Sequence, residues 1–410
     1  MNKTMCVMPW VHTATISDGT VKLCCVAHAD SKLNLNEQTI TEVWNSEYYQ
    51  QQRREFLAGG KPKACEHCWR EEAAGVRSHR EISNDIFQRH LGKDYLDRLC
   101  SSEVVEQVPL TIDFRLGNTC NLQCVMCQPS DSSKWVKPAK QLAARIKSNL
   151  KWDWTFKSNI DTTKFEWYKR KQFWSDFDTI AEGIKHITFG GGEPLLVKEH
   201  KELIKRLVEN GHAKSMKLLY HTNGTIYDQE IVDLWSHFDE VKLMISIDGL
   251  EEINDYIRRP SKWAEVYDNL KLYDQTGSNI VVAINTTVQV SNIANLTKFA
   301  QWMLDEKFIK VGHQTDGGIF FASVLHWPKY LSVQVLPEGM KRAVSEEIQK
   351  FCDLYPTNPG VQRLRTVVDF MNADNQSHMW PRTTEYFANL DSLDADKHVS
   401  TEFPVRVVKV

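Results

Sequence analysis

The central part of the chain alternates between short apolar runs and longer stretches with helical periodicity. This alternation is typical of a βα repeat, in which parallel strands are joined by crossover helices. Six runs have the composition of buried or half-buried strands; they lie at 110–116, 184–189, 216–220, 241–247, 280–285 and near 317–321. The pattern therefore predicts an α/β domain with parallel strands over residues 109–335.

The segment before this repeat has another pattern. Residues 16–23 predict a hairpin, because Asp18-Gly19 favours a tight turn between two short strands. Residues 41–57 predict a helix. These elements predict a small N-terminal α+β domain over residues 1–80, followed by a charged helical connector over 81–108.

Beyond the repeat, residues 337–352 and 361–371 are compatible with helices. We therefore expect C-terminal helices and a tail over residues 336–410. The tail is polar, and its pattern assigns no fold to it.

Composition narrows the class of protein. The 410 residues are 42% hydrophobic and 25% charged, which allows a sizeable core and two or three domains. A net charge of −3 provides no broad basic field, which argues against a nucleic-acid binder. No run is long and apolar enough to span a membrane, and residues 1–10 lack the apolar core of a secretion signal. We expect a cytoplasmic protein, in which clustered cysteines act as metal ligands rather than disulfides.

Three cysteines occupy one short loop directly after the first strand of the repeat. Cys120, Cys124 and Cys127 have the spacing C-x3-C-x2-C, which lets three thiolates face a common centre. Thiolates are soft ligands that suit zinc or iron–sulfur clusters. On a four-iron cube, three thiolates would leave one iron open for substrate chemistry. The alternative is a coincidence of spacing.

A second group of cysteines lies in the first 80 residues: Cys6, Cys24, Cys25, Cys65 and Cys68. Tetrahedral zinc and an iron–sulfur cluster both suit such a set. Neighbouring side chains in a strand point to opposite faces, so only one of Cys24 and Cys25 is expected to face the metal.

The cysteine loop resembles that of the radical S-adenosylmethionine (SAM) superfamily. In that family three thiolates hold a [4Fe–4S] cluster whose open iron chelates SAM. One electron splits SAM, and the resulting 5′-deoxyadenosyl radical takes a hydrogen atom from the substrate. The resemblance implies that Cys120, Cys124 and Cys127 bind this cluster. It places Met126, where the family usually has an aromatic residue, beside the SAM adenine. It also implies that the six strands form a partial (β/α)6 TIM-type barrel.

The second strand of the repeat ends in a glycine run that resembles the family's GGEP motif. Glycines let a ligand approach the backbone closely, although such a run is more often only a turn. The resemblance implies that Gly191, Gly192 and Glu193 hold the amino group of SAM.

Polar residues also follow the third and fourth strands, at the ends where the chemistry of βα barrels gathers. In the family such residues meet the ribose and carboxylate of SAM. The resemblance implies this role for Asn223, Ser246 and Arg258. The alternative is that Asn223-Gly224 and Asp248-Gly249 are simply turns.

The N-terminal cysteines resemble the twitch module, a shorter relative of the SPASM domain. The matching pattern is Cys6-x12-Gly19-x4-Cys24, followed by Cys65-x2-Cys68. It implies that Cys6, Cys24, Cys65 and Cys68 hold an auxiliary [4Fe–4S] cluster in a small N-terminal iron–sulfur domain. This module usually follows the barrel, whereas here it precedes it. Four thiolates leave no open iron, which predicts an electron-transfer or structural role. Cys25 would be a packed thiol or a hydrogen-atom donor.

The stretch over about 150–180 is longer than one crossover helix needs and is rich in aromatic residues: Trp152, Trp154, Phe156, Phe165, Trp167, Tyr168, Phe173, Trp174 and Phe177. One interpretation is an added layer that buries these rings against the barrel. The other is a lid or substrate wall, because aromatic side chains dominate interface energetics.

The resemblance implies a radical SAM oxidoreductase or modifying enzyme, which we expect to act on a peptide or protein. One alternative is a dehydrogenase or modifying enzyme for a small molecule or nucleotide. A second is a non-catalytic scaffold with zinc at both cysteine groups. The expected partners are SAM, the substrate and a low-potential electron donor such as flavodoxin or ferredoxin. We expect no membrane partner and no nucleic acid.

Overall fold

A mostly parallel sheet carries the fold, with eight strands in the order β2-β1-β3-β4-β5-β6-β7-β8. The computed structural model describes residues 2–145, 160–312 and 318–394. The six strands from β3 onward confirm the predicted α/β repeat; they are β3 (Thr111–Arg115), β4 (His186–Gly190), β5 (Lys217–Thr222), β6 (Glu240–Ser246), β7 (Ile280–Val288) and β8 (Phe321–Val324). The last strand begins where its predicted range ends, and residue 317 lies outside the described residues.

The predicted N-terminal hairpin exists, with its turn and its second strand, β2 (Val21–Lys22), inside the predicted range of 16–23. Its first strand, β1 (His12–Thr15), pairs antiparallel with β2 but lies ahead of that range. Gly19 lies in the turn with a φ of 84°, a conformation that glycine adopts without a steric penalty. The sequence did not predict that β1 also pairs in parallel with β3, with His12 opposite Thr111. The hairpin therefore extends the edge of the sheet.

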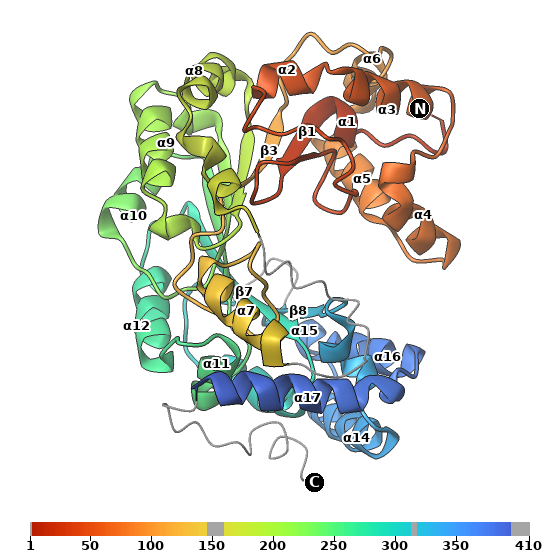
Figure 1. Cartoon of the computed structure of the whole chain (residues 1–410), viewed down its shortest axis with the longest axis vertical. Coiled ribbons are helices and arrows are strands. Elements are labelled where there is room, and N and C mark those ends of the chain that lie inside the picture. The colour runs from red at the N-terminus through yellow and green to blue at the C-terminus, as the bar shows by residue number, and fades with distance from the viewer. Residues whose placement is uncertain (1, 146–159, 313–317, 395–410) are drawn as a thin grey trace. The chain divides into compact units, whose positions relative to one another are not determined.

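The single helix predicted over 41–57 is wrong, because the structure has α2 (Ile40–Trp44) and α3 (Glu47–Leu57) instead. Thr39 and Glu42 form a capping box at the start of α2. Asn45 ends that helix, and its side chain binds the carbonyl of Val105 at 2.7 Å. The other helices before β3 are α1 (Met8–Val11), α4 (Glu66–Ala73), α5 (His79–Leu91) and α6 (Lys93–Leu99). In Figure 1, α1 lies beside α3, α5 and β1, with which it is in contact.

The chain divides into two compact units that are not contiguous in sequence. The first unit comprises Met1–Thr119, Asp161–Tyr220 and Asp233–Val241, and the second comprises Cys120–Ile160, His221–Val232 and Lys242–Val410. Strands β5 and β6 contribute residues to both. The domain boundaries that the sequence predicts at residues 80, 108 and 335 stay predictions.

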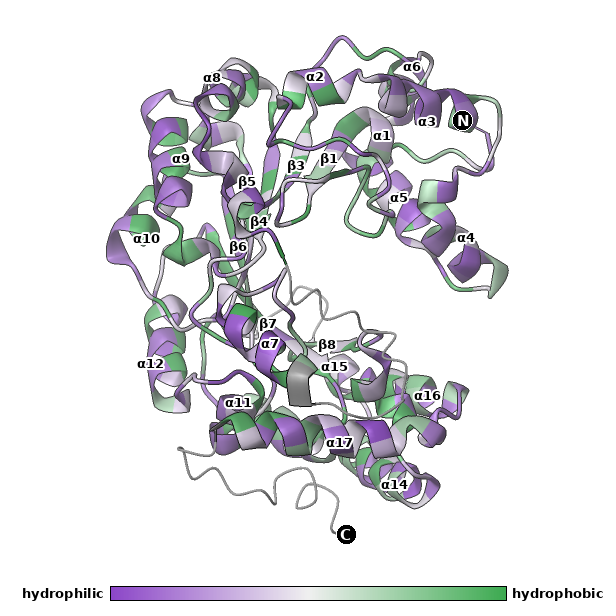
Figure 2. Ribbon diagram, in the orientation of Figure 1, coloured by the Kyte–Doolittle hydropathy of each residue, from purple (hydrophilic) through white to green (hydrophobic). Residues whose placement is uncertain are grey.

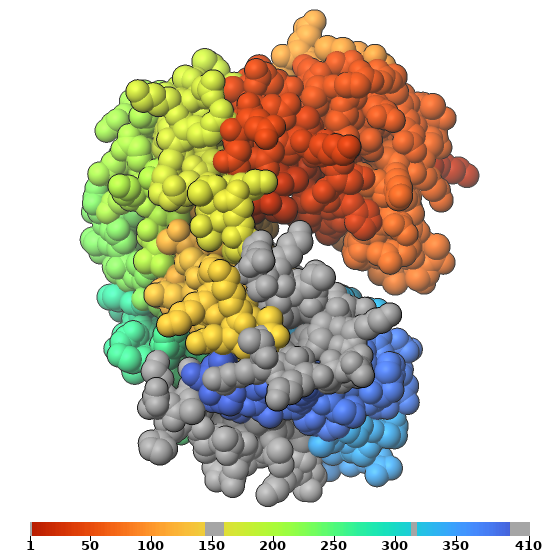
Figure 3. Space-filling view, viewed as in Figure 1, coloured from red at the N-terminus to blue at the C-terminus, as the bar shows by residue number. Residues whose placement is uncertain are grey.

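The core of the first unit is aromatic and includes the predicted aromatic stretch. Phe114 on β3 packs against Trp167, Phe173 and Phe177, with ring centroids 5.7–6.0 Å apart. These rings come from a short 3-10 segment (Thr162–Lys169) and from α8 (Lys171–Ile180). Figure 3 shows this yellow-green segment directly against the red N-terminal residues. The packing-layer interpretation holds for these residues, whereas Trp152, Trp154 and Phe156 lie outside the described residues.

Hydropathy follows burial within this unit. In Figure 2, α4 is largely hydrophilic, and Cys68 is its buried residue. Helix α9 (Lys198–Glu209) buries one face against the sheet, where His200 bonds the buried Tyr220 hydroxyl at 2.8 Å.

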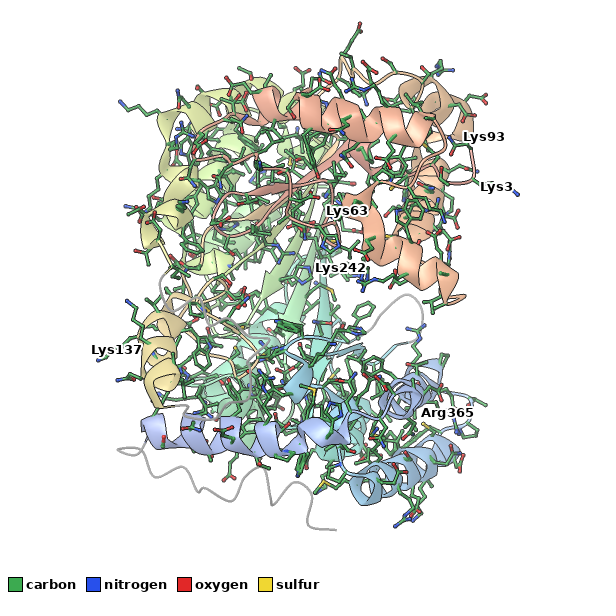
Figure 4. The ribbon with its side chains drawn as sticks, turned by 45° about the vertical axis from the view of Figure 1, so that its right-hand side comes forward. Lys3, Lys63, Lys93, Lys137, Lys242 and Arg365 are labelled. Atoms are coloured by element: carbon green, nitrogen blue, oxygen red, sulfur yellow. The ribbon has the colours of Figure 1, made fainter. Side chains whose placement is uncertain are left out.

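The second unit contains most of the remaining helices: α7 (Val136–Arg145), α11 (Glu251–Ile257), α12 (Trp263–Asp274), α13 (Leu296–Asp305), α14 (Glu338–Leu354), α15 (Pro359–Gln362), α16 (Leu364–Ala373) and α17 (Trp380–Asp391). Helix α10 (Gln229–Trp235) contributes residues to both units. Helices α14 and α16 confirm the predicted C-terminal helices. An ion pair of 2.9 Å joins them, between Arg365, labelled in Figure 4, and Asp353. Helix α17 was not predicted; it passes beside α7.

Within the described part of the chain, no helix combines the length and apolar character that a membrane crossing requires.

Candidate functional site

The three-cysteine loop belongs to the second unit, where backbone hydrogen bonds fix its path. The amide of Gln123 donates to the carbonyl of Arg259 at 2.6 Å, and the amide of Val125 donates to that of Ile257 at 2.8 Å. The loop is thereby held against the C-terminal end of α11. Cys124 is buried, whereas Cys120 and Cys127 are half-buried.

Three side chains from two further segments bind the carbonyl groups of the loop. Ser132 donates to Leu122 at 2.5 Å, and the Trp135 indole donates to Cys124 at 2.9 Å. The Tyr386 hydroxyl, from α17, donates to the carbonyl of Val125 at 2.7 Å. Because buried carbonyl groups require such partners, these bonds fix the loop in one conformation.

Two side chains approach the sulfur atoms of the loop. Asn223 Nδ2 lies 3.9 Å from Cys120 Sγ, and Arg258 Nη1 lies 3.9 Å from Cys124 Sγ. Asp248 holds the other side of Arg258, with 2.9 Å between Oδ2 and Nε. The resemblance assigned Asn223 and Arg258 to SAM, and in this structure both contact the cysteine loop.

The electrostatics of the loop favour a thiolate at Cys124. A hydrogen bond from the Cys127 thiol lowers the pKa of Cys124, and Arg258 lowers it further against the opposing effect of burial. The same hydrogen bond, together with burial, raises the pKa of Cys127. Burial by itself would lower the pKa of Arg258, but Asp248 and the thiolates raise it above its ordinary value. Since metals bind the thiolate form, the loop is chemically prepared for a metal.

The other predicted SAM residues of the second unit lie on the loop or at a strand end. Met126 is half-buried between Val125 and Cys127. Ser246 is the last residue of β6 and is also half-buried.

The glycine stretch lies in the first unit, against the backbone that leads into the cysteine loop. A Cβ on Gly192 would collide with the carbonyl oxygen of Thr119, and the amide of Glu193 donates to that oxygen at 2.7 Å. Gly191 has a φ of 106°, and a Cβ there would lie 2.7 Å from the carbonyl oxygen of Gly117. Glycine is required here because the two backbones approach so closely. Glu193 is 1% exposed, and its carboxylate accepts from the amide of Leu195 at 3.2 Å.

The first unit also gathers the four N-terminal cysteines predicted as ligands. Burial raises the pKa of Cys6, and the negative charges of Cys24, Cys65 and Cys68 raise it further, so the four sulfur atoms share one region. Burial, followed by the charge of the adjacent Cys25, raises the pKa of Cys24 to about 12. Four thiols of this kind stay protonated until a metal displaces the protons.

Cys25 differs from its neighbour Cys24. It is exposed, and its sulfur lies 3.7 Å from Nε2 of His79. The expectation of a packed thiol is therefore wrong. Nε2 of His28 lies 3.5 Å from a carboxylate oxygen of Glu66, and Nε2 of His67 lies 3.3 Å from one of Glu71.

Neither group is shaped for a single metal ion: among the described residues, no three His, Cys, Asp or Glu side chains are arranged to hold one. The fit to an iron–sulfur cluster rests on donor chemistry. Both groups offer thiols, the ligands of such clusters, and one group already favours a thiolate.

Comparison with known proteins supports both cysteine groups. Residues 114–302 match the family model of the radical SAM superfamily, and residues 6–69 match that of an iron–sulfur cluster-binding domain, SPASM. The sporulation killing factor maturation protein SkfB of Bacillus subtilis (strain 168) is 24% identical over 259 residues, or 60% of this chain and 55% of SkfB. Fe-coproporphyrin III synthase of Methanosarcina barkeri is 24% identical over 208 residues, or 46% of this chain and 51% of that enzyme.

Among solved structures, Streptococcus suis SuiB bound to the precursor peptide SuiA aligns with a TM-score of 0.32 and 12% identity. That alignment covers 79% of this chain and 64% of SuiB. The chain spans about half the length of the curated relatives named above.

Residues 114–302 thus form a radical SAM domain, and a SPASM domain lies ahead of it in the chain. These domains carry [4Fe–4S] clusters and bind SAM, as the resemblance implied. The predicted order, with the cluster-binding domain at the N-terminus, is confirmed.

Sequence reasoning missed the residues that support the cysteine loop. Asp248 was interpreted only as part of a turn, although its carboxylate is buried and paired with Arg258. Tyr386 carries no local signal, because it is 261 residues away from the carbonyl it binds.

Proposed function

We propose that this enzyme cleaves SAM at a [4Fe–4S] cluster held by Cys120, Cys124 and Cys127. The observation that carries the proposal is the loop itself, in which the buried Cys124 lies between two half-buried cysteines and has Arg258 Nη1 3.9 Å from its sulfur. When bound, the cluster would supply the electron that splits SAM into methionine and a 5′-deoxyadenosyl radical, which would take a hydrogen atom from the substrate.

The chain's own residues orient the reactants in this proposal. In this proposal Gly191, Gly192 and Glu193 hold the amino group of SAM. Ser246 lies at a strand end suited to the ribose or carboxylate, and Met126 packs against the adenine through its flexible thioether. The domain boundaries near residues 80, 108 and 335 belong to the same proposal, because both family matches fall inside them.

The four cysteines of the first unit, Cys6, Cys24, Cys65 and Cys68, hold an auxiliary [4Fe–4S] cluster. Its four thiolates saturate the cube, so it carries electrons or stabilises the fold. A low-potential donor such as flavodoxin or ferredoxin supplies the electrons.

The substrate we favour is a peptide or protein. A relative named as a maturation protein for a sporulation killing factor supports this choice. The second candidate is a small molecule, which the name of Fe-coproporphyrin III synthase supports.

The test of the reaction is dithionite-dependent formation of 5′-deoxyadenosine from SAM by anaerobically purified protein. Cys124→Ala should abolish it, because the variant lacks a ligand of the SAM-binding cluster. Cys100→Ala is the matched control, since Cys100 is buried but belongs to neither group. Product formation by Cys124→Ala at the wild-type rate would show that the loop does not carry the reaction.

A further inference from the structure

Two amino-acid side chains present N–H groups to the sulfur atoms of the cysteine loop. Asn223 Nδ2 faces Cys120, and Arg258 Nη1 faces Cys124, each at 3.9 Å. N–H···S hydrogen bonds are longer than those to oxygen because sulfur is the larger atom. Two of the three proposed ligands therefore have a side-chain donor of their own.

The guanidinium of Arg258 is fixed from behind. Asp248 Oδ2 lies 2.9 Å from its Nε, and the two side chains are 9% and 0% exposed. The other oxygen of Asp248 accepts from the amide of Thr287 at 2.7 Å. This carboxylate cannot swing away, so it holds Nη1 of Arg258 toward Cys124.

The amide of Asn223 is fixed in a similar way. Its Oδ1 accepts from the amide and the hydroxyl of Thr225, at 3.0 and 2.6 Å. Its Nδ2 donates to Oδ1 of Asn121 at 2.8 Å. These partners assign the oxygen to one side and the NH₂ group to the other, where Cys120 lies.

The geometry points to Arg258 and Asn223 as positioning residues that set the reduction potential of the cluster on this loop through hydrogen bonds to its ligand sulfurs. The inference rests on the proposed function, because it requires the cluster at Cys120, Cys124 and Cys127. Hydrogen bonds to the sulfurs are among the factors that set such potentials. They stabilise the more negative, reduced cluster and so raise its potential, and the charge of Arg258 acts in the same direction.

The experiment is a redox titration of the full chain, without SAM, followed by electron paramagnetic resonance. The signal of the loop cluster is the one missing from Cys124→Ala. Arg258→Met removes the donor and its charge. Asn223→Asp keeps the oxygen that binds Thr225 but replaces the NH₂ group with a second oxygen. Arg259→Met is the matched control: it removes the next charge in the chain, whose guanidinium binds Asp391 and Tyr256 instead.

We expect both donor variants to lower the ratio of reduced to oxidised cluster at a fixed applied potential by at least about tenfold. For a one-electron couple this is a shift of about 59 mV to lower potential. Arg259→Met should shift it by much less. If Arg258→Met does not fold, Arg258→Lys replaces it. Lysine keeps the charge but lacks the forked guanidinium group, so a lowered potential is again expected.

An intact cluster with an unchanged potential in the donor variants would overturn the inference and leave the proposed function standing. An equal shift in Arg259→Met would also overturn it, because charge alone would then explain the effect. If the wild-type protein holds no cluster at this loop, the proposed function fails as well.

Discussion

The two cysteine groups use the same ligand in opposite ways. On the loop of the second unit, the guanidinium of Arg258 lies beside one of three thiols, that of Cys124, and the pKa of Cys124 lies below its ordinary value. In the first unit, four thiols lie together, and burial is the first cause that raises the pKa of each of them. The loop contains one cysteine, Cys124, whose thiolate is favoured, and it offers one thiol too few to close a cube. The four thiols of the first unit are enough to ligate every iron of a cube, but they stay protonated without metal. The difference teaches that ligand count and local charge, and not the cysteine itself, separate a reactive site from a closed one.

The largest effect should come from removing one proposed ligand of the N-terminal cysteine group. Cys24→Ser removes one of four ligands, so the protein should lose about four irons, or one cube. Cys25→Ser should keep them, because the thiol of Cys25 is exposed beside His79. Iron and acid-labile sulfide analysis of both variants measures the difference.

The reverse result would make Cys25 the ligand. Loss of iron in neither variant would mean that another ligand, either His28, His67 or the substrate, takes the place assigned to Cys24.

The next largest effect should come from Trp167, which supports the N-terminal cysteine group and not the cysteine loop. Trp167 is fully buried and touches Gly19, in the hairpin that leads to Cys24. Trp167→Ala should lower the free energy of unfolding by about 3–5 kcal/mol, the usual cost of removing a large buried ring. Chemical denaturation measures it, with the half-buried Trp174→Ala as a control that should cost less.

SAM cleavage per folded molecule should stay unchanged in Trp167→Ala. A stable variant that has lost product formation would instead favour a substrate wall.

Lowering the pH should reduce the folding stability of the first unit, because unfolding lets His12 on β1 take up a proton. Burial lowers the pKa of His12 to about 4, from 6.5. The unfolded chain therefore binds an additional proton between these values, so stability is complete above pH 6.5 and falls as the pH drops toward 4. The loss should reach roughly 2–3 kcal/mol.

Denaturation at pH 7 and pH 4.5 checks this effect. His12→Gln should lose less stability on acidification than wild type, whereas the exposed His237→Gln should behave like wild type. Equal acid sensitivity in all three proteins would dismiss the role of His12.

The smallest effect concerns the loop of the second unit. Tyr386→Phe leaves the buried carbonyl of Val125 without its donor, which should cost about 1–3 kcal/mol. Tyr355→Phe is the control, because its hydroxyl binds the side chain of Gln301 at a half-buried position. If the two variants lose the same free energy, α17 does not support the loop in the way proposed.

Much of the fold could be predicted because its signals are local. Strand runs and turn residues such as Asp18-Gly19 act within a few positions; the turn was located correctly, and the strands were found with shifts of a few residues at β1 and β8. The break between α2 and α3 was missed, because Asn45 is held by Val105, which is 60 residues away. The pairing of β1 with β3 joins segments about 100 residues apart and leaves no local pattern.

The candidate site could likewise be predicted from the sequence only where its signals are local. The spacing of Cys120, Cys124 and Cys127 is local, and so is the glycine run. The direction in which Arg258 and Asn223 point depends on Asp248 and Thr225, so the sequence could not separate contact with SAM from contact with sulfur. Tyr386 lies in a segment whose pattern assigned no structure.

The most direct test of the central claim uses the Cys24→Ser variant, in which only the loop cluster should remain. Its reduced electron paramagnetic resonance spectrum should change when SAM is added, because SAM binds the open iron of that cluster. Cys124→Ala, which should keep only the closed cluster, should show no such change. A SAM-dependent change that persists in Cys124→Ala and is absent from Cys24→Ser would contradict the assignment of the reactive cluster to the loop.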